Sequence, residues 1–391
     1  MGFSFKTFLK HTAKDFHNHS VNPPVVRAST IIFKSMNDIR KTQTKYKRDP
    51  RGGYFDYGRQ GTSTTHILQK ILTKLEESYH VFLTSTGFGS VFLAIFSIVR
   101  PGDEILIADP VYNPTRMLTQ DYLKEFNIKT IFYNPHDFNS IKKNITKKTK
   151  LIFVENPGSN TFEFQDLSKI LAIAKKNKIY TAIDNTWATP YFFKPIKLGF
   201  DMAIVSATKY YSGHSDVMGG SLAVNKKVFK QVERAQKYIG LRLGPDDAYL
   251  IIRGLRTLDV RLDKHQENAK KVAAFLSKNK KVKLLYPYKK GSLNYKLWKK
   301  YYSGASGLMG IKIKSKNKKS VIKFVNSLKL FGYGYSWGGF ESLVLHQGKS
   351  ERGNRRYLNL NKDERLIRLH IGLEDPKELI EDLGKSLKFV K

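Results

Sequence analysis

Between residues 57 and 245 the sequence alternates segments of helical periodicity with short apolar runs, and this alternation limits the possible folds most strongly. Helices are expected near 65–78 and 88–98. The apolar runs lie at 104–108, 130–133, 151–155, 180–184 and 202–207. Short apolar strands that alternate with helices are typical of a mostly parallel sheet with helices on both faces. The pattern therefore predicts an α/β fold for this part of the chain.

Two regions of different character flank this part. Residues 1–54 show little regular periodicity and carry Pro23–Pro24, which predicts an extended N-terminal arm. A long amphipathic helix is expected over 246–279, followed by short strands and by helices near 317–329 and 376–387. We therefore expect three parts, namely an arm at 1–54, a main α/β domain at 55–245 and a smaller C-terminal α+β domain at 246–391.

The composition excludes several classes of protein. With 391 residues, 41% of them apolar, the chain can bury a large core and is not a disordered protein. It has no cysteine, which excludes disulfide scaffolds and cysteine nucleophiles and agrees with a reducing compartment. Its longest nearly pure apolar run, 90–99, is about half of the roughly 20 residues that cross a bilayer. Lys6 and Lys10 interrupt the apolar residues of the first segment. We expect a cytoplasmic protein without a membrane span.

The chain is strongly basic, since 69 Lys and Arg against 33 Asp and Glu give a formal net charge of +36. Such a charge raises the hypothesis of nucleic-acid binding. The lysines, however, are scattered in short clusters such as 142–148 and 175–178. Base readout favours arginine, whose planar fork bridges two acceptors. We therefore interpret the charge as a solvated surface without a specific nucleic-acid partner. A noncatalytic, basic nucleic-acid-binding protein remains the alternative from another class.

The strongest local signal is SATKYYSGHSDVMGG at 206–220, where an apolar run leads to Lys209 and then to a glycine-containing loop. The carboxyl ends of parallel strands face the ligand crevice of such a sheet. A lysine shielded from water there can lose its proton and attack a carbonyl. A surface lysine at the end of a strand would give the same pattern. The hydroxyls of Ser206 and Thr208 flank Lys209 and could donate to a phosphate.

Asp184 and Tyr112 follow two other apolar runs and are expected at the same edge of the sheet. A lysine and a carboxylate in one crevice suit pyridoxal phosphate, because the lysine binds the aldehyde and the carboxylate keeps the ring nitrogen protonated. Tyr112 could stack on the flat ring. Alternatively, it is a turn residue between Pro110 and Pro114.

A fourth segment, TSTGFGS at 84–90, opens the helix expected near 88–98. Small residues there let backbone amides approach an anion at the start of a helix, where the dipole favours negative charge. The segment has neither the Walker spacing nor GxGxxG, so a nucleotide site is not indicated. An ordinary Ser or Thr helix cap is the alternative. The spacing of the histidines predicts no metal site.

These segments together resemble the Cys/Met-metabolism family of pyridoxal-phosphate enzymes, from about residue 22 to about residue 382. The motifs that carry the resemblance are NPPVVRASTIIF from residue 22, YGRQGTSTT at 57–65, TGFGS at 86–90, DPVYNPT at 109–115, ENPGSNTFE at 155–163, IDNTWATP at 183–190, SATKYYSGHSDVMGG at 206–220, YSWGGFESL at 335–343 and LIRLHIGLED at 366–375. The resemblance implies the aspartate aminotransferase-like fold, with a mostly parallel seven-stranded sheet, and pyridoxal 5'-phosphate as cofactor.

The resemblance also implies roles for individual residues. Lys209 would carry the cofactor and act as base, Asp184 would bind the ring nitrogen and Tyr112 would stack on the ring. Arg368, with Ser336 beside it, would bind the substrate α-carboxylate, a task that suits a bidentate guanidinium. Further cofactor contacts would come from Gly87, Phe88, Ser159, Ser206 and Thr208, and from Tyr57 and Arg59 of a neighbouring subunit. Either Tyr112 or Tyr57 would assist proton transfer. The active site would then require a dimer, and we expect a homotetramer.

Two motifs bear on which bond is cut. Relatives that act at the γ-carbon carry YxRxxNPT and SLGGxES, whereas this chain has Gly61–Thr64 and Ser336–Gly339 at those places. Trp337 therefore points to the β-lyase branch of the family and would line the substrate site. The implied reaction is β-elimination of L-cystathionine to homocysteine, pyruvate and ammonia in methionine biosynthesis. Cystathionine γ-synthase, cystathionine γ-lyase and methionine γ-lyase activities remain the alternatives within the family.

Overall fold

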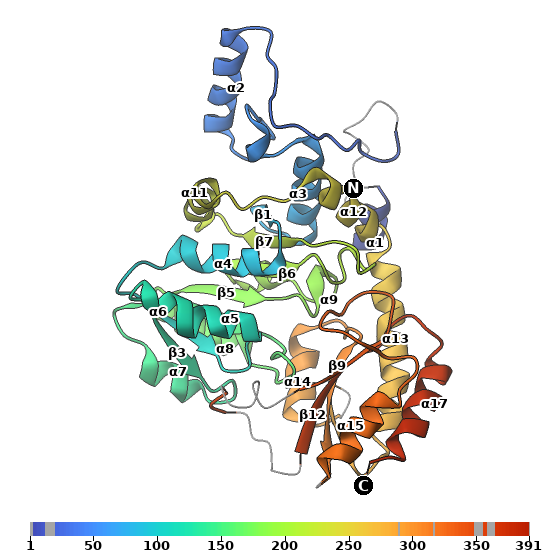
Figure 1. Cartoon of the computed structure of the whole chain (residues 1–391). Coiled ribbons are helices and arrows are strands. Elements are labelled where there is room, and N and C mark those ends of the chain that lie inside the picture. Colours follow the sequence, from blue (N-terminus) through green and yellow to red (C-terminus); the bar gives the residue numbers. More distant parts are fainter. Residues whose placement is uncertain are drawn as a thin grey trace.

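The computed structural model describes residues 3–11, 20–287, 290–315, 317–347, 355–357 and 364–390. Its central feature is a seven-stranded sheet in the order β1-β7-β6-β5-β4-β2-β3 (Figure 1). The strands are β1 (His80–Thr84), β2 (Glu104–Ala108), β3 (Lys129–Tyr133), β4 (Thr149–Glu155), β5 (Tyr180–Asp184), β6 (Met202–Ser206) and β7 (Gly220–Val224). Strand β7 runs antiparallel to its neighbours β1 and β6, and the other pairings are parallel.

Helices cover both faces of this sheet, because successive apolar side chains along each strand point to opposite sides. In β2, Ile105 and Ile107 belong to the core under α4 (Gly87–Ile98) and α11 (Phe229–Ile239). Leu106 and Ala108 belong to the core on the other face, with α3 (Ser63–Leu75) and α8 (Leu167–Lys176). The predicted α/β fold with a mostly parallel sheet is confirmed.

The remaining helical segments of the main part are short. They are η2 (Gly58–Gln60), α5 (Asn113–Met117), the π-helical turn η3 (Leu118–Tyr122), α6 (Leu123–Glu125), α7 (Phe138–Asn144), α9 (Thr189–Phe192) and α10 (Pro195–Leu198). Among the described residues, no helix combines the length and the apolar character that crossing a membrane requires.

A second, five-stranded sheet follows, in the order β10-β11-β12-β9-β8, and all of its pairings are antiparallel except β10 with β11. Its strands are β8 (Val282–Leu285), β9 (Leu308–Lys314), β10 (Gly332–Tyr333), β11 (Leu343–His346) and β12 (Glu364–His370). Helices α14 (Leu293–Tyr301), α15 (Lys318–Asn326) and α17 (Pro376–Leu387) accompany it. Strands mixed with helices agree with the predicted α+β character, and the boundaries at 54 and 245 remain predictions.

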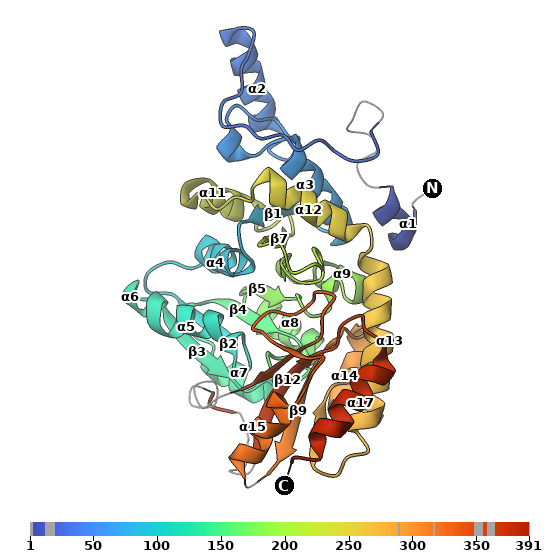
Figure 2. The same ribbon diagram turned by 45° about the vertical axis from the view of Figure 1, so that its right-hand side comes forward.

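The single long helix expected over 246–279 is wrong. The structure has two helices there, α12 (Pro245–Leu255) and α13 (Leu258–Leu276), and α13 runs down beside the smaller sheet (Figure 2). The break occurs where Gly254 passes so close to the main chain that an added Cβ would overlap the carbonyl oxygens of Tyr211 and Ser212. The Arg261 side chain also donates to the Gly254 carbonyl at 2.7 Å. This tertiary contact, and not a local sequence signal, interrupts the helix.

The extended arm is also corrected, because residues 1–54 contain α1 (Phe5–Lys10) and α2 (Met36–Arg48). A serine hydroxyl caps each helix, Ser4 accepting from the Thr7 amide and Ser35 from the Asp38 amide. Helix α1 lies on the body of the molecule with Leu9 fully buried. Helix α2 buries no residue and projects away from the sheets in both views (Figures 1 and 2).

Candidate active site

Strands β4, β5 and β6 bring their carboxyl ends together at one edge of the main sheet. Asp184 ends β5 and pairs in register with Ile204 of β6. Lys209 follows β6 by three residues, in a turn where its amide donates to the Ser206 carbonyl at 3.1 Å. The structure therefore places the predicted carboxylate and the predicted lysine at the same edge of the sheet, in electrostatic contact with each other, as the strand-end argument requires.

The amine of Lys209 is held by residues from the second sheet region. Its Nζ lies 2.8 Å from the Ser336 hydroxyl and 5.5 Å from the centre of the Trp337 ring. Desolvation and, to a smaller extent, the positive charge of Arg368 lower the pKa of Lys209, and the negative charge of Asp184 opposes them, so that the pKa falls from 10.5 to about 8. A substantial fraction of this amine is therefore neutral, and so nucleophilic, slightly above neutral pH.

The segment that carries Ser336 and Trp337 is fixed from both sides. From β12, Arg368 donates to the carbonyls of residues 334, 335 and 336, the shortest of these bonds being 2.7 Å. On the other side Gly338, with a φ of +89°, lies so near Lys209 that an added Cβ would stand 3.0 Å from the lysine backbone. Arg368, Ser336, Trp337 and Lys209 thus form one constellation.

Asp184 is oriented by the residues that follow it. Its Oδ1 accepts a hydrogen bond from the Thr186 amide at 2.9 Å. Desolvation raises the pKa of Asp184, while the bonds from Thr186 and the charge of Lys209 lower it. The bonds from Thr186 and the charge of Lys209 favour the ionised form of Asp184. This is the form that would bind the protonated ring nitrogen of pyridoxal phosphate.

Three of the predicted phosphate residues, Gly87, Phe88 and Ser206, meet at the start of α4. Thr86 caps this helix by accepting from the Gly89 amide at 2.9 Å, so the segment is indeed a capped helix start. An added Cβ at Gly87 would overlap the Ser206 side chain, while Phe88 is 39% exposed. The Thr208 hydroxyl is 3.2 Å from the Gly219 carbonyl. The structure brings Gly87 and Ser206 into direct contact, with Phe88 and Thr208 as their chain neighbours.

Tyr112 and Ser159 meet at Glu155, a residue that the sequence analysis did not select. The Tyr112 amide donates to Oε2 of Glu155 at 2.6 Å, and the Ser159 side chain bonds the same carboxyl. Glu155 ends β4 as Asp184 ends β5. The rule that found Asp184, a polar residue closing an apolar run, would also have found Glu155.

Tyr57 and Arg59 lie elsewhere in this chain. Tyr57 is 46% exposed and forms a bridge with Thr30 of the arm. The Arg59 guanidinium lies 3.4 Å from the Lys237 carbonyl of α11 and 5.9 Å from the Tyr57 ring. These contacts join the arm to α11, and they do not bring either residue to Lys209.

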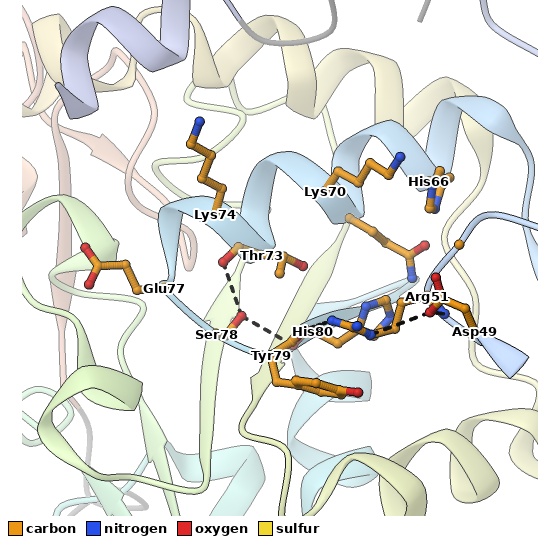
Figure 3. Close-up of a pocket in the computed structure, with 12 residues that line it drawn as sticks. Asp49, Arg51, His66, Lys70, Thr73, Lys74, Glu77, Ser78, Tyr79 and His80 are labelled. Atoms are coloured by element: carbon orange, nitrogen blue, oxygen red, sulfur yellow. Dashed lines mark hydrogen bonds and ion pairs between the residues drawn. The ribbon is translucent and has the colours of Figure 1, made fainter. Parts of the chain in front are cut away.

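A separate hollow of about 550 Å³ lies beside α3 and β1 (Figure 3). Arg51 there lies 4.0 Å from the Tyr79 ring centre and donates to the Tyr79 carbonyl. Side chains of both charges line the hollow, among them the acidic Asp49 and Glu77 and the basic Lys74. None of the predicted site residues lines it, so it is distinct from the crevice at Lys209.

Comparison with known proteins decides the family. The family model described as Cys/Met metabolism PLP-dependent enzyme matches residues 6–388. The chain belongs to this family. It is 35% identical to a cystathionine beta-lyase of Bordetella avium, over 94% of this chain and 92% of that protein. It is 34% identical to an L-alanine/L-glutamate racemase of Wolbachia pipientis wMel, over 98% of this chain and 96% of that protein.

A solved structure agrees with the fold. The cystathionine gamma synthase from Xanthomonas oryzae pv. oryzae superposes with a TM-score of 0.90 at 28% identity, covering 100% of this chain and 99% of that one. The predicted resemblance to the Cys/Met-metabolism family is therefore confirmed, and with it the aspartate aminotransferase-like fold, a PLP-dependent enzyme and carbon–sulfur lyase chemistry.

The residues of this Cys/Met-metabolism enzyme fit pyridoxal phosphate. The close approach of Gly87 to the Ser206 side chain places a hydroxyl beside the start of α4, where the backbone and the helix dipole favour a phosphate. Asp184 offers a carboxylate and Lys209 an amine whose pKa of about 8 suits reaction with an aldehyde. The cofactor expected from the sequence is thus matched by the chemistry of the groups present.

Proposed function

We propose that this enzyme is a cystathionine β-lyase that acts in methionine biosynthesis. The observation that carries the proposal is the position of Trp337, whose ring lies 5.5 Å from the Lys209 amine, next to Ser336 and Arg368. Trp337 stands where relatives acting at the γ-carbon carry a smaller residue, so a bulkier side chain lies beside the base in this chain. The relative from Bordetella avium, named as a cystathionine beta-lyase, supports the same activity.

Each site residue then has a task. Arg368 binds the substrate α-carboxylate through a guanidinium that its bonds to the 334–336 carbonyls hold in place. Asp184, and Tyr112 on the ring face, hold the cofactor, while Gly87, Phe88, Ser206 and Thr208 hold its phosphate. When bound, pyridoxal phosphate acts as an electron sink for the substrate α-carbon. Arg368 thus orients the substrate and the other residues orient the cofactor, while Tyr112, or Tyr57 of a neighbouring copy, assists proton transfer.

Lys209 is the base in this proposal. Its Nζ, 2.8 Å from the Ser336 hydroxyl, takes the proton from the substrate α-carbon, and the bond from the β-carbon to sulfur then breaks. The pKa of about 8 lets the amine both accept and return a proton near neutral pH. The net reaction consumes L-cystathionine and water and yields homocysteine, pyruvate and ammonia.

We also propose that two copies of the chain share each active site. Tyr57 pairs with Thr30 and Arg59 donates to the Lys237 carbonyl, not to the Lys209 site of their own chain. In the projecting N-terminal part, Ile32 and Met36 are 92% and 67% exposed. A neighbouring copy could cover these apolar side chains and receive Tyr57 and Arg59 at its own cofactor. A homotetramer and a cytoplasmic location complete the proposal, the latter supported by the lack of cysteine.

Racemisation is a second candidate, because a relative of similar identity is named as an L-alanine/L-glutamate racemase. Removal of the α-proton by Lys209 is common to both reactions. A racemase returns a proton to the opposite face of the α-carbon, whereas a β-lyase expels the β-substituent. Cystathionine γ-synthase or γ-lyase activity would instead break or form a bond at the γ-carbon.

The test is to incubate the purified protein and pyridoxal phosphate with L-cystathionine, and separately with L-alanine, and to identify products by mass and chirality. Pyruvate with homocysteine supports the β-lyase, and 2-oxobutyrate with cysteine assigns a γ-lyase. D-alanine without keto acid assigns a racemase. The Lys209→Ala variant is the control and should give none of these products. For the shared site, mixing inactive Lys209→Ala with inactive Arg59→Ala should restore part of the activity.

A further inference from the structure

Glu155 and Asp184 form a carboxyl pair at the edge of the main sheet that precedes Lys209. They stand directly opposite each other on the adjacent parallel strands β4 and β5, at the last residue of each strand. Side chains at such paired positions project to the same face of the sheet, and neighbouring strands are only about 4.8 Å apart. Two carboxyl groups this close in a desolvated site do not both ionise readily.

Different partners distinguish the two carboxyls. Asp184 is bonded by the amide and the side chain of Thr186 and faces the Lys209 amine, and all of these favour the ionised form. Glu155 accepts from the Tyr112 amide at 2.6 Å and bonds Ser159, with the Arg355 guanidinium in electrostatic contact. The surroundings therefore favour ionisation of Asp184 over that of Glu155.

The charge of Asp184 adds to desolvation at Glu155. Together they raise the pKa of Glu155 well above its usual range, even though Tyr112, Arg355 and Ser159 act in the opposite direction. For Asp184, desolvation raises the pKa, whereas the hydrogen bonds from Thr186 and the charge of Lys209 lower it. The bond from the Thr186 amide and the charge of Lys209 both act on Asp184, which favours Glu155 as the holder of a proton shared between the two groups.

We propose that Glu155 is a positioning residue that works as a neutral acid, anchoring Tyr112 at the start of α5 while leaving Asp184 the single negative charge beside the cofactor ring. Its Oε2 accepts the Tyr112 amide hydrogen, so the proton lies on Oε1. The Tyr112 ring is 45% exposed, and the bond from its amide to Glu155 ties that ring to the sheet edge. The proposal goes beyond the β-lyase activity and holds for any reaction of this cofactor.

The neutral state can be tested with Glu155→Gln, which keeps an acceptor for the Tyr112 amide and cannot ionise. We expect the dissociation constant of pyridoxal phosphate, measured by titrating the apoprotein, to change by less than about threefold. Glu155→Ala, which removes the acceptor, should weaken cofactor binding by about tenfold or more. Asp184→Asn should also weaken it and should shift the absorption spectrum of the bound cofactor, which Glu155→Gln leaves unchanged.

A direct readout does not depend on cofactor or activity. The infrared difference spectrum of the wild-type apoprotein minus Glu155→Gln at neutral pH should contain the carbonyl band of a protonated carboxylic acid. A carboxylate band in its place would overturn the proposal. Loss of cofactor affinity in Glu155→Gln as large as that in Glu155→Ala would also overturn it, because the negative charge would then be needed. Thermal unfolding of each apoprotein shows whether Glu155→Ala folds. If it does not fold, the infrared spectrum and the cofactor affinity of Glu155→Gln alone test the proposal.

Discussion

The Lys209 amine lies 2.8 Å from the Ser336 hydroxyl, and this contact joins the main sheet to a segment that precedes the last strands of the second sheet. Arg368 donates to the carbonyl of Ser336, so the lysine proposed to carry the cofactor and the guanidinium proposed to bind the substrate are linked through one residue. Movement of the 334–341 segment would therefore change the position of base and substrate together.

The first prediction concerns the ionisation of Lys209. With a pKa of about 8, its amine should be half neutral at that pH, so attachment of pyridoxal phosphate to the apoprotein should speed up between pH 7 and 9. Stopped-flow absorbance over this range measures the midpoint. Arg368→Met removes a positive charge that lowers this pKa and should move the midpoint upward. A midpoint near 10.5 in the wild type would show that the amine is not desolvated.

The second prediction concerns Gly87. In Gly87→Ala the new methyl group would overlap the Ser206 side chain, so α4 must shift at its first turn. We expect a loss of about 1–3 kcal/mol in the free energy of unfolding of the apoprotein and at least tenfold weaker binding of pyridoxal phosphate.

Gly384→Ala is the matched control, since this glycine lies within α17 and its added Cβ would stand 3.4 Å from Phe275. A helical Gly-to-Ala change of this kind should be neutral or stabilise by up to about 1 kcal/mol. Equal effects of the two substitutions on urea unfolding would contradict the contact between Gly87 and Ser206.

The third prediction uses a buried acid outside the active site. Glu76 is 1% exposed and accepts from the Tyr211 hydroxyl at 2.8 Å, and desolvation raises its pKa from 4.5 to about 7. Between these two pH values the folded protein retains a proton that the unfolded chain releases. The free energy of unfolding therefore falls as the pH rises through this window.

Glu76→Gln removes the free-energy cost of ionising a buried carboxyl above pH 7, because the amide stays neutral. The amide can still accept the hydrogen bond from Tyr211. At pH 8.5 we expect the variant to be more stable than the wild type by about 2–3 kcal/mol, and at pH 4.5 to match it closely. Urea unfolding at the two pH values measures the difference. A variant that is less stable than wild type at pH 8.5 would show that Glu76 is ionised and paired in the folded protein.

The sequence predicts the parts of the fold that local patterns control. The runs at 104–108 and 180–184 become β2 and β5 with the same bounds, because continuous apolar residues between turn signals specify a buried strand. Strand β7 is not predicted, since it begins at Gly220 and is defined by antiparallel pairing with β1 and β6. The break between α12 and α13 depends on the fit of Gly254 against residues distant in the chain.

The residues of the candidate site also fall into those that local sequence patterns predict and those that they do not. The position of Asp184, Tyr112 and Lys209 after apolar strands is enough to place them at one edge of the sheet. Arg368 and Ser336, from a separate sheet region, have no such local signal, and only the family resemblance suggests them. The roles of Tyr57 and Arg59 depend on a second copy of the chain and remain predictions.

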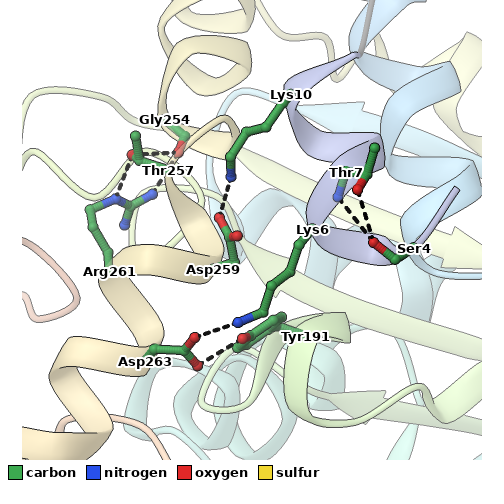
Figure 4. A network of polar contacts seen from close by, with 10 residues as sticks. All are labelled: Ser4, Lys6, Thr7, Lys10, Tyr191, Gly254, Thr257, Asp259, Arg261 and Asp263. Carbon is green, nitrogen blue, oxygen red and sulfur yellow. Dashed lines mark hydrogen bonds and ion pairs between the residues drawn. The ribbon is translucent and has the colours of Figure 1, made fainter.

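The last prediction compares two ion pairs that join α1 to α13 (Figure 4). Lys10 lies 2.5 Å from Asp259, whose side chain is only 6% exposed, whereas Lys6 lies 2.7 Å from Asp263, and both members of that pair are about half exposed. Lys10→Met leaves a nearly buried carboxylate without its cation and should lower the free energy of unfolding by about 1–2 kcal/mol, moderated by the position of Asp259 in the first turn of α13. Lys6→Met removes the same charge from an exposed pair, where solvent screening should make the loss smaller than that of Lys10→Met. Urea unfolding of the two variants at low and high salt compares them, and equal losses would show that burial of Asp259 does not strengthen its pair.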